Sequence, residues 1–163
     1  MINKIRNCKK CNGTGYIRVG NDSWKRCPEC YPIREKLQKY KNANIPEKFW
    51  NFEIENVNKE IMINTTKQKK IEINFKNLYQ YYTKNIKKYI NKGRGLYIAG
   101  DIGSGKTTLA ILIGKYAIVH NYKVSYIKYY DVIEKYRDSW GSDNQGKIKQ
   151  EINQTILRGT LRP

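Results

Sequence analysis

The stretch Gly100-Asp101-Ile102-Gly103-Ser104-Gly105-Lys106-Thr107 fits the pattern G-x-x-x-x-G-K-[ST]. In this pattern the glycines let successive backbone N–H groups point inward at phosphate oxygens. Lys106 would bring positive charge to the β- and γ-phosphates, and the Thr107 hydroxyl would ligate Mg²⁺. A helix starting here would add its dipole to the anion site. The motif therefore predicts a nucleotide-binding loop, and the alternative is a chance glycine-rich turn.

The segments around this loop predict an α/β arrangement. Residues 96–99 are an apolar run suited to a buried strand, and residues 106–120 have the apolar spacing of a helix that packs on a sheet. A second strand is predicted over 123–127, with a helix from about Asp131 to Asp138. Before the loop, apolar residues recur at helical steps from Ile71 to Ile90. That tyrosine-rich stripe indicates a core-facing helix, although lysines beside it would also suit nucleic acid.

All four cysteines lie in the first thirty residues, as two Cys-x-x-Cys pairs separated by fifteen residues. They are Cys8, Cys11, Cys27 and Cys30. This spacing is typical of a four-cysteine zinc site, in which the residues between the pairs form a short hairpin. Neighbouring basic residues would offset the thiolate charge: Lys9, Lys10, Lys25 and Arg26. Two disulfides or a redox Cys-x-x-Cys are the alternatives, which a cytosolic chain without a thioredoxin-like βαβ pattern disfavours.

The residues between the two pairs would give the ribbon a basic, aromatic surface. They are Tyr16, Arg18, Trp24, Lys25 and Arg26. Trp24 either stacks on a base or packs over the metal site, which is the commoner arrangement. A ribbon of this kind binds DNA, binds protein, or folds the N-terminus, and the sequence leaves these roles open.

The composition points towards polyanionic partners. The chain has 32 Lys and Arg against 14 Asp and Glu, a formal net charge of +18, which favours nucleic acid. Lys, Asn, Ile and Tyr have AT-rich codons, however, so genomic drift is a competing explanation of the excess lysine. The sequence has neither a run of about eighteen apolar residues nor a signal-peptide pattern at its start. We therefore expect a cytoplasmic protein without a membrane partner.

The order of these features resembles the bacterial and phage replicative helicase loaders of the DnaC/DnaI type, within the AAA+ ATPases. The resemblance runs from Cys8 to Trp140 and includes the Ile-Pro-x-x-Phe-Trp-x-Phe segment Ile45–Phe52. It implies that Gly100, Gly103, Ser104, Gly105, Lys106 and Thr107 hold ATP phosphates and Mg²⁺, with Thr108 near the α-phosphate. It also implies that Ile45–Phe52 lies near the base and that the N-terminal region contacts a replicative helicase. Single-stranded DNA would bind the ATPase domain, and the full-length protein would form a homo-oligomer.

The predicted organisation is an α/β chain with a zinc ribbon over 1–32, a linker over 33–66, and the N-terminal part of an AAA+ P-loop domain over 67–163. Hydrolysis in such enzymes requires a second acidic motif after an apolar strand. No acidic residue after Lys106 follows such a run; Asp131 comes closest but predicts a helix cap. We therefore expect ATP binding with weak or absent hydrolysis, and we assign no catalytic residue.

The end of the chain falls where loaders have their acidic motif, so we expect either an incomplete reading frame or a short form completed by a partner. In AAA+ folds, strands from later sequence separate the P-loop strand from the next one. The strand over 96–99 would then lack its normal partners.

Three functions fit the sequence. The first is a loader-like ATPase, and the second is a zinc-ribbon module for DNA or protein with a vestigial ATPase half. The third is an ATPase helper of a transposition system, a class that usually lacks a cysteine ribbon. Small-molecule kinases share the loop but neither the ribbon nor the linker.

Overall fold

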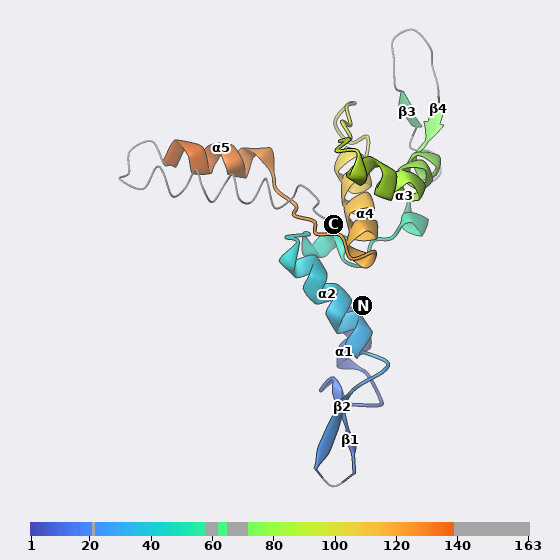
Figure 1. Cartoon of the computed structure of the whole chain (residues 1–163), viewed down its shortest axis with the longest axis vertical. Coiled ribbons are helices and arrows are strands. Elements are labelled where there is room, and N and C mark those ends of the chain that lie inside the picture. Colours follow the sequence, from blue (N-terminus) through green and yellow to red (C-terminus); the bar gives the residue numbers. More distant parts are fainter. Residues whose placement is uncertain (21, 58–61, 65–71, 139–163) are drawn as a thin grey trace. The chain divides into compact units, whose positions relative to one another are not determined.

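The computed structural model describes residues 1–20, 22–57, 62–64 and 72–138 (Figure 1). The chain divides into two compact units, Met1–Asn51 and Phe52–Pro163, called unit 1 and unit 2 below. The predicted linker 33–66 is thus shared between the two units. None of the helices in the described ranges is both long and apolar enough to span a bilayer.

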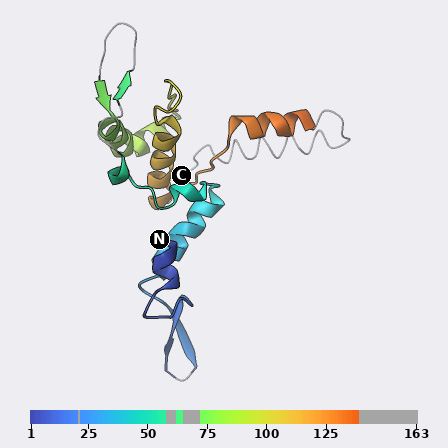
Figure 2. The same ribbon diagram turned by 180° about the vertical axis from the view of Figure 1, so that it is seen from behind.

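Unit 1 is a β-hairpin with a helix before and after it. Its elements are α1 (Ile2–Arg6), β1 (Tyr16–Val19), β2 (Ser23–Arg26), α2 (Tyr31–Asn42) and the 3₁₀ turn η1 (Glu47–Phe49). β1 and β2 are antiparallel and lie side by side in both views (Figures 1 and 2), with Tyr16 opposite Arg26 and Val19 opposite Ser23. The hairpin predicted between the cysteine pairs is confirmed.

The end of α2 is closed by the residues that follow it. Tyr40, on the last turn, is fully buried, and the Ile45 N–H donates to its carbonyl oxygen at 3.0 Å. Pro46 disfavours helix in the residue before it, and Ile45 instead buries its side chain. The Trp50 indole N–H donates to the Ile45 carbonyl at 2.8 Å. The helix therefore ends before Ile45-Pro46.

Unit 2 is built on two helices, α3 (Phe75–Asn91) and α4 (Lys106–Val119), which pack against each other. Its other elements are the 3₁₀ turn η2 (Ile54–Asn56), the antiparallel pair β3 (Met62–Asn64) and β4 (Glu72–Asn74), and α5 (Tyr129–Asp138). The Asn74 Oδ1 accepts a hydrogen bond from the Lys76 N–H at 2.8 Å, a side-chain cap that fixes the start of α3.

The core of unit 2 lies between α3, α4 and the chain segment that enters the unit. Its buried members are Val57, Phe75, Leu109 and Leu112, with Phe52, Ile54, Leu78, Tyr79, Ile98 and Ile113 packed against them. The predicted stripe of α3 is buried or half-buried, while Lys84, Lys87 and Lys88 are exposed. The core-facing interpretation is confirmed for the described residues; Ile71 lies outside them.

An ion pair between the buried Lys115 and the exposed Glu53 side chain ties the entering segment to α4. The Lys115 side chain is only 3 % exposed, and its Nζ lies 3.5 Å from the Glu53 Oε1. The same Nζ donates a hydrogen bond to the Phe52 carbonyl oxygen. A buried ammonium needs such partners because desolvation of an unpaired charge costs several kcal/mol. The pair therefore attaches residues 52–53 to the middle of α4.

The prediction of a strand on each side of the loop and its helix is wrong. Neither 96–99 nor 123–127 forms a strand; Tyr97 is 91 % exposed, and only Ile98 packs against the core. A strand requires a hydrogen-bonding neighbour, and the described residues place none beside either segment. These residues therefore form a mixed α/β chain with two small antiparallel sheets, without a central sheet behind the loop.

An apolar cavity of about 310 Å³ lies between α3, α4 and these two segments. Its lining includes Ile86 from α3, Ile113 from α4, Leu96 and Val124. A Cβ built on Gly114 of α4 would lie 3.5 Å from the Val124 side chain, so this segment runs close to the helix.

Candidate metal centre and phosphate-binding loop

The cysteines are positioned by the ends of the unit 1 elements. Cys8 and Cys11 follow α1, Cys27 follows β2, and Cys30 is the residue before α2. The Cys27 N–H donates to the Gly15 carbonyl at 2.8 Å, which closes the hairpin beside the first pair. Gly13 has a φ of 78°, and a Cβ there would lie 2.8 Å from the Arg6 carbonyl oxygen, so only glycine fits this turn.

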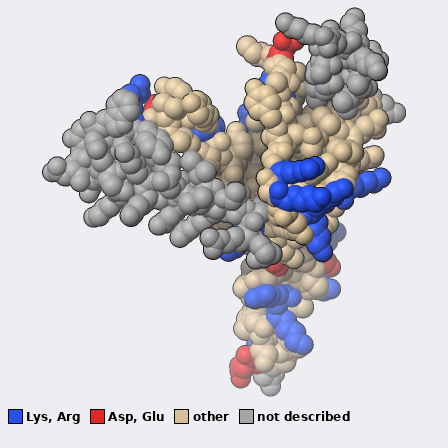
Figure 3. All heavy atoms as spheres, turned by 45° about the horizontal axis from the view of Figure 1, so that its top comes forward, with Lys and Arg blue, Asp and Glu red and all other residues tan. Residues whose placement is uncertain are grey.

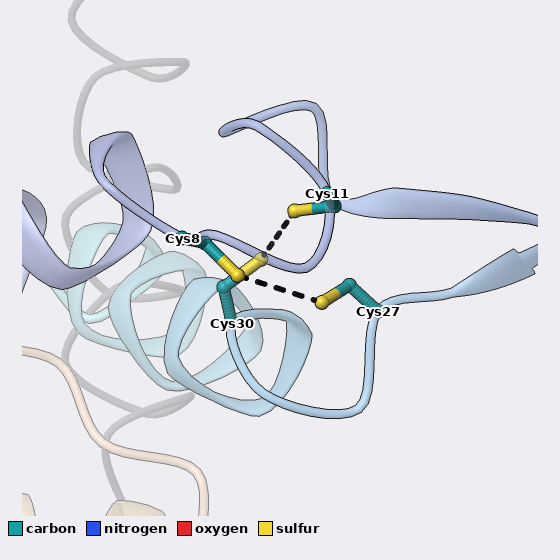
Figure 4. A group of neighbouring side chains, drawn as sticks. All are labelled: Cys8, Cys11, Cys27 and Cys30. Atoms are coloured by element: carbon teal, nitrogen blue, oxygen red, sulfur yellow. Dashed lines mark hydrogen bonds between the residues drawn. The ribbon is translucent and has the colours of Figure 1, made fainter.

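The structure brings the four predicted ligands together in one buried cluster (Figure 4). All four Sγ atoms lie within 4.8 Å of one another. The Cys8 and Cys27 sulfurs are 3.7 Å apart, and the Cys11 and Cys30 sulfurs are 3.4 Å apart. A tetrahedral zinc with Zn–S bonds of about 2.3 Å separates its sulfurs by about 3.8 Å. The four cysteines can therefore bind zinc without large movements.

The four cysteines form no disulfide in this structure. A disulfide requires an S–S distance of about 2.05 Å, whereas all four thiols are free. The closest sulfurs also belong to different pairs rather than to one Cys-x-x-Cys. The prediction that Trp24 packs over the metal site is wrong, because Ile5 and Ile17 pack against the cysteines instead.

Arg34 is a charged neighbour of the cluster that the sequence analysis missed. It extends from α2 and donates through Nη2 to the Gly13 carbonyl oxygen. Its Nε is buried and has no hydrogen-bond partner among the described residues. The Arg34 side chain acts to lower the pKa of Cys30, which fits an anionic thiolate cluster. The signal was available, since Arg34 stands four residues after Cys30 on the same helical face.

The basic residues expected beside the thiolates offset less of the thiolate charge than Arg34 does. Lys10 forms an ion pair with Glu29, with 3.7 Å between its Nζ and the Glu29 Oε1. Lys25 and Arg26 are exposed on the hairpin. The Glu29 Oε2 also accepts a hydrogen bond from the Cys8 thiol, at 3.8 Å from the sulfur.

The thiols differ in acidity because their surroundings differ. Burial raises the pKa of Cys11, but the Gly15 N–H, which donates to its sulfur at 3.3 Å, and the neighbouring thiols lower the pKa to about 6. Burial and the Cys11 thiol raise the pKa of Cys30 to about 12, with Arg34 acting in the opposite direction. Burial also raises the pKa of Cys8. A metal ion would therefore displace protons from the less acidic thiols, and binding would release them.

The loop before α4 has the backbone conformation that its glycines predict. Gly100, Gly103 and Gly105 have φ values of 151°, 85° and 79°, a region that residues with a side chain rarely adopt. Gly105 is the N-cap of α4, and its carbonyl accepts the Leu109 N–H at 2.9 Å. The Ser104 N–H donates to the Asp101 carbonyl at 3.2 Å. The chain therefore turns tightly into a helix N-terminus, which is a favourable position for an anion.

The Lys106 side chain folds back over this loop. Its Nζ donates to the carbonyl oxygens of Gly100 and Asp101, at 2.7 and 2.6 Å, and lies 3.3 Å from the Ser104 hydroxyl. Thr107 is exposed and Thr108 half-buried in the first turn of α4. Gly100, Asp101 and Ser104 thus contact the Lys106 ammonium, while Thr107 and Thr108 lie in the adjoining first turn of the helix.

Comparisons of the chain with protein-family models, with curated proteins and with solved structures give no match. The functional argument therefore rests on the cysteine cluster and the loop.

Proposed function

We propose that this protein binds ATP with Mg²⁺ on residues 100–108 and zinc on its four cysteines. We propose further that it serves DNA replication as a helicase-loader-like protein, which helps to place a replicative helicase on single-stranded DNA. The observation that carries the first part is the position of the Lys106 ammonium inside a loop with three glycines of positive φ. The second part rests on the resemblance in the order of ribbon, linker, helix and loop.

Each loop residue has a separate role in this proposal. The Lys106 ammonium already lies at the N-terminus of α4, so it supplies charge to phosphate oxygens without crossing the loop. The Thr107 hydroxyl is exposed on the same turn and is available as a ligand for Mg²⁺. The cysteines hold the zinc, which would stabilise unit 1 and the partner contact made by the ribbon.

Replacement of Lys106 tests the ATP site directly. In the Lys106→Ala protein, ATP affinity measured by calorimetry should fall roughly ten- to hundredfold, as expected for loss of hydrogen bonds to a charged group. Zinc content measured by mass spectrometry should not change, because the cysteines belong to unit 1. Lys84→Ala is the matched control, since Lys84 is exposed on α3. Equal ATP affinity in the Lys106→Ala and wild-type proteins would contradict the proposal.

The missing strands favour a second candidate function, a zinc-ribbon binding module with a vestigial ATPase half. Residues 96–99 and 123–127 do not form the sheet that supports a P-loop in an ATPase. Under this alternative the wild-type protein binds no ATP, while its zinc-loaded ribbon still binds its partner. Calorimetry of the wild-type protein therefore separates the two candidates.

A further inference from the structure

We infer that one face of the β1–β2 hairpin binds single-stranded DNA through stacked bases and backbone phosphates. This surface lies in unit 1, whereas the proposed function places nucleotide binding in unit 2. The inference rests on the proposed function only for the choice of DNA over RNA. The shape and chemistry of the face come from unit 1 alone.

The strand register places two aromatic and two arginine side chains on one face. Tyr16 lies opposite Arg26, and Arg18 lies opposite Trp24. Residues that alternate along a strand share a face, and so do residues directly opposite in an antiparallel pair. These four residues, which we call the stacking face, therefore lie on the same side of the hairpin.

The other side of the hairpin faces the cysteines, so the stacking face is turned away from them. Ile17, which alternates with Tyr16 and Arg18, packs against the cysteine cluster. All four residues of the stacking face are exposed, including 64 % of Trp24 and 47 % of Tyr16. An exposed tryptophan near an exposed tyrosine places apolar ring surface in water, which is unfavourable. Such a pair points to an interaction surface.

Contacts at the start of α2 extend this face. The Tyr31 ring meets the Tyr16 ring edge-on, with centroids 6.0 Å apart. The Arg26 guanidinium lies over the Tyr31 ring, 4.6 Å from its centroid. These contacts restrain the Tyr16 and Arg26 side chains before any ligand arrives, which lowers the entropy cost of binding.

The pattern of the stacking face matches the chemistry of a single strand. Tyr16 and Trp24 are diagonal neighbours, with backbones about 7–8 Å apart, so each ring can stack on a separate base. Arg18 and Arg26 occupy the other diagonal and can contact the phosphates between those bases. Bases in a duplex are already stacked on each other, so flat rings of this kind favour unpaired nucleotides.

The charge of unit 1 supports a polyanionic ligand. Residues 1–51 contain twelve Lys or Arg and four Asp or Glu, and no acidic side chain belongs to the stacking face. Over the described part of the whole chain, Figure 3 shows more basic than acidic surface. A protein partner for this face would need carboxylates to match the arginines, and that possibility is one outcome of the test below.

The test is fluorescence anisotropy of a labelled oligothymidine of about 16 nucleotides, with the zinc-loaded full chain and no ATP. Trp24→Ala should weaken binding about tenfold or more, because base stacking is lost, and Trp24→Phe should restore most of it. Arg18→Ala should weaken binding and reduce the salt dependence by about one phosphate contact. Lys25→Ala is the matched control, since it removes one charge from the opposite face. An unchanged affinity in Trp24→Ala, or equal losses in Arg18→Ala and Lys25→Ala, would overturn the inference.

Further measurements distinguish binding of single-stranded DNA from loss of folding and from binding of duplex DNA, RNA or protein. If Trp24→Ala loses its zinc, then Trp24→Phe together with the Arg18 and Lys25 variants decides the question. Equal affinity for duplex DNA would overturn the stacking argument, and tighter binding of oligouridine would overturn the choice of DNA. Absence of oligothymidine binding, with retention of an acidic protein partner, would also overturn it. Lys106→Ala should still bind oligothymidine, so a failure of the ATP site and a failure of this face give different results.

Discussion

Units 1 and 2 differ in what holds their chain segments together. In unit 1, the cluster that joins α1, the hairpin and α2 consists of four thiols whose closest contacts join residues nineteen positions apart. In unit 2, the core consists of aliphatic and aromatic side chains from η2, α3 and α4. Two further segments beside that core, 96–99 and 123–127, remain without strand partners among the described residues.

Local sequence is sufficient to determine the structure of the ribbon, but it is not sufficient for the strands predicted in unit 2. A ribbon closed by a metal ion needs only its own residues and the ion, because the ligand bonds replace a large apolar core. A P-loop strand needs neighbouring strands from elsewhere to satisfy its backbone groups. The first arrangement is complete within thirty residues, and the second depends on distant partners.

The largest effect should come from removal of a zinc ligand. Cys27 is fully buried in the cluster, and Cys27→Ser should reduce the zinc content from one ion per chain to none. Zinc binding in small domains contributes folding free energy of the order of 10 kcal/mol, so unit 1 should unfold. NMR should show loss of the β1–β2 amide signals, with the signals of α3 and α4 unchanged. Ser23→Ala, an exposed change on β2, is the control. Survival of the hairpin without metal would contradict the view that zinc replaces an apolar core in unit 1.

The next effect concerns the apolar core of unit 2. Leu109 is fully buried between α3 and α4, and Leu109→Ala should destabilise this unit by about 2–5 kcal/mol through lost burial and a new cavity. Val119→Ala, at an exposed position of the same helix, should cost about 0.5 kcal/mol or less. Denaturant unfolding followed by the α3 and α4 signals measures both. Release of zinc by the Leu109 variant would show that the two units are not separate.

The smallest effect on stability should come from replacement of the loop glycine Gly103. Gly103 and Gly93 have φ values of 85° and 60°, and a Cβ at either position would meet no atom within 4 Å. Replacement by alanine should therefore cost each protein about 1 kcal/mol through the backbone alone. Only Gly103→Ala should also weaken ATP binding, because Gly93 lies outside the loop. Equal ATP affinities in the two variants would mean that the loop conformation does not matter for binding.

The elements that the sequence predicts well depend on neighbouring residues. The spacing of Cys8, Cys11, Cys27 and Cys30 is sufficient to place four thiols in one cluster, because a short hairpin joins the pairs. The stripe of α3 and the start of α4 at Lys106 follow from helical periodicity and from Gly105. These features needed no knowledge of the rest of the chain.

The features that could not be predicted from the sequence depend on contacts with distant residues, which periodicity does not describe. Residues 96–99 have strand composition, but no neighbouring strand is described beside them. The sequence leaves the position of Trp24 open, because a large side chain fits on either face of a short hairpin. In the structure, Ile17 occupies the face that packs against the cysteines. Lys115 looks like a solvent-facing lysine in sequence, although its partner Glu53 is more than sixty residues earlier in the chain.

The Lys115–Glu53 pair has a consequence for the orientation of the loop. α4 buries apolar residues on every side, so apolar packing alone accepts several rotations of this helix about its axis. A buried ammonium that must reach one carboxylate and one carbonyl accepts a single rotation. Lys106 lies on the same rigid helix, so the direction in which its loop faces is set by a charge two and a half turns away.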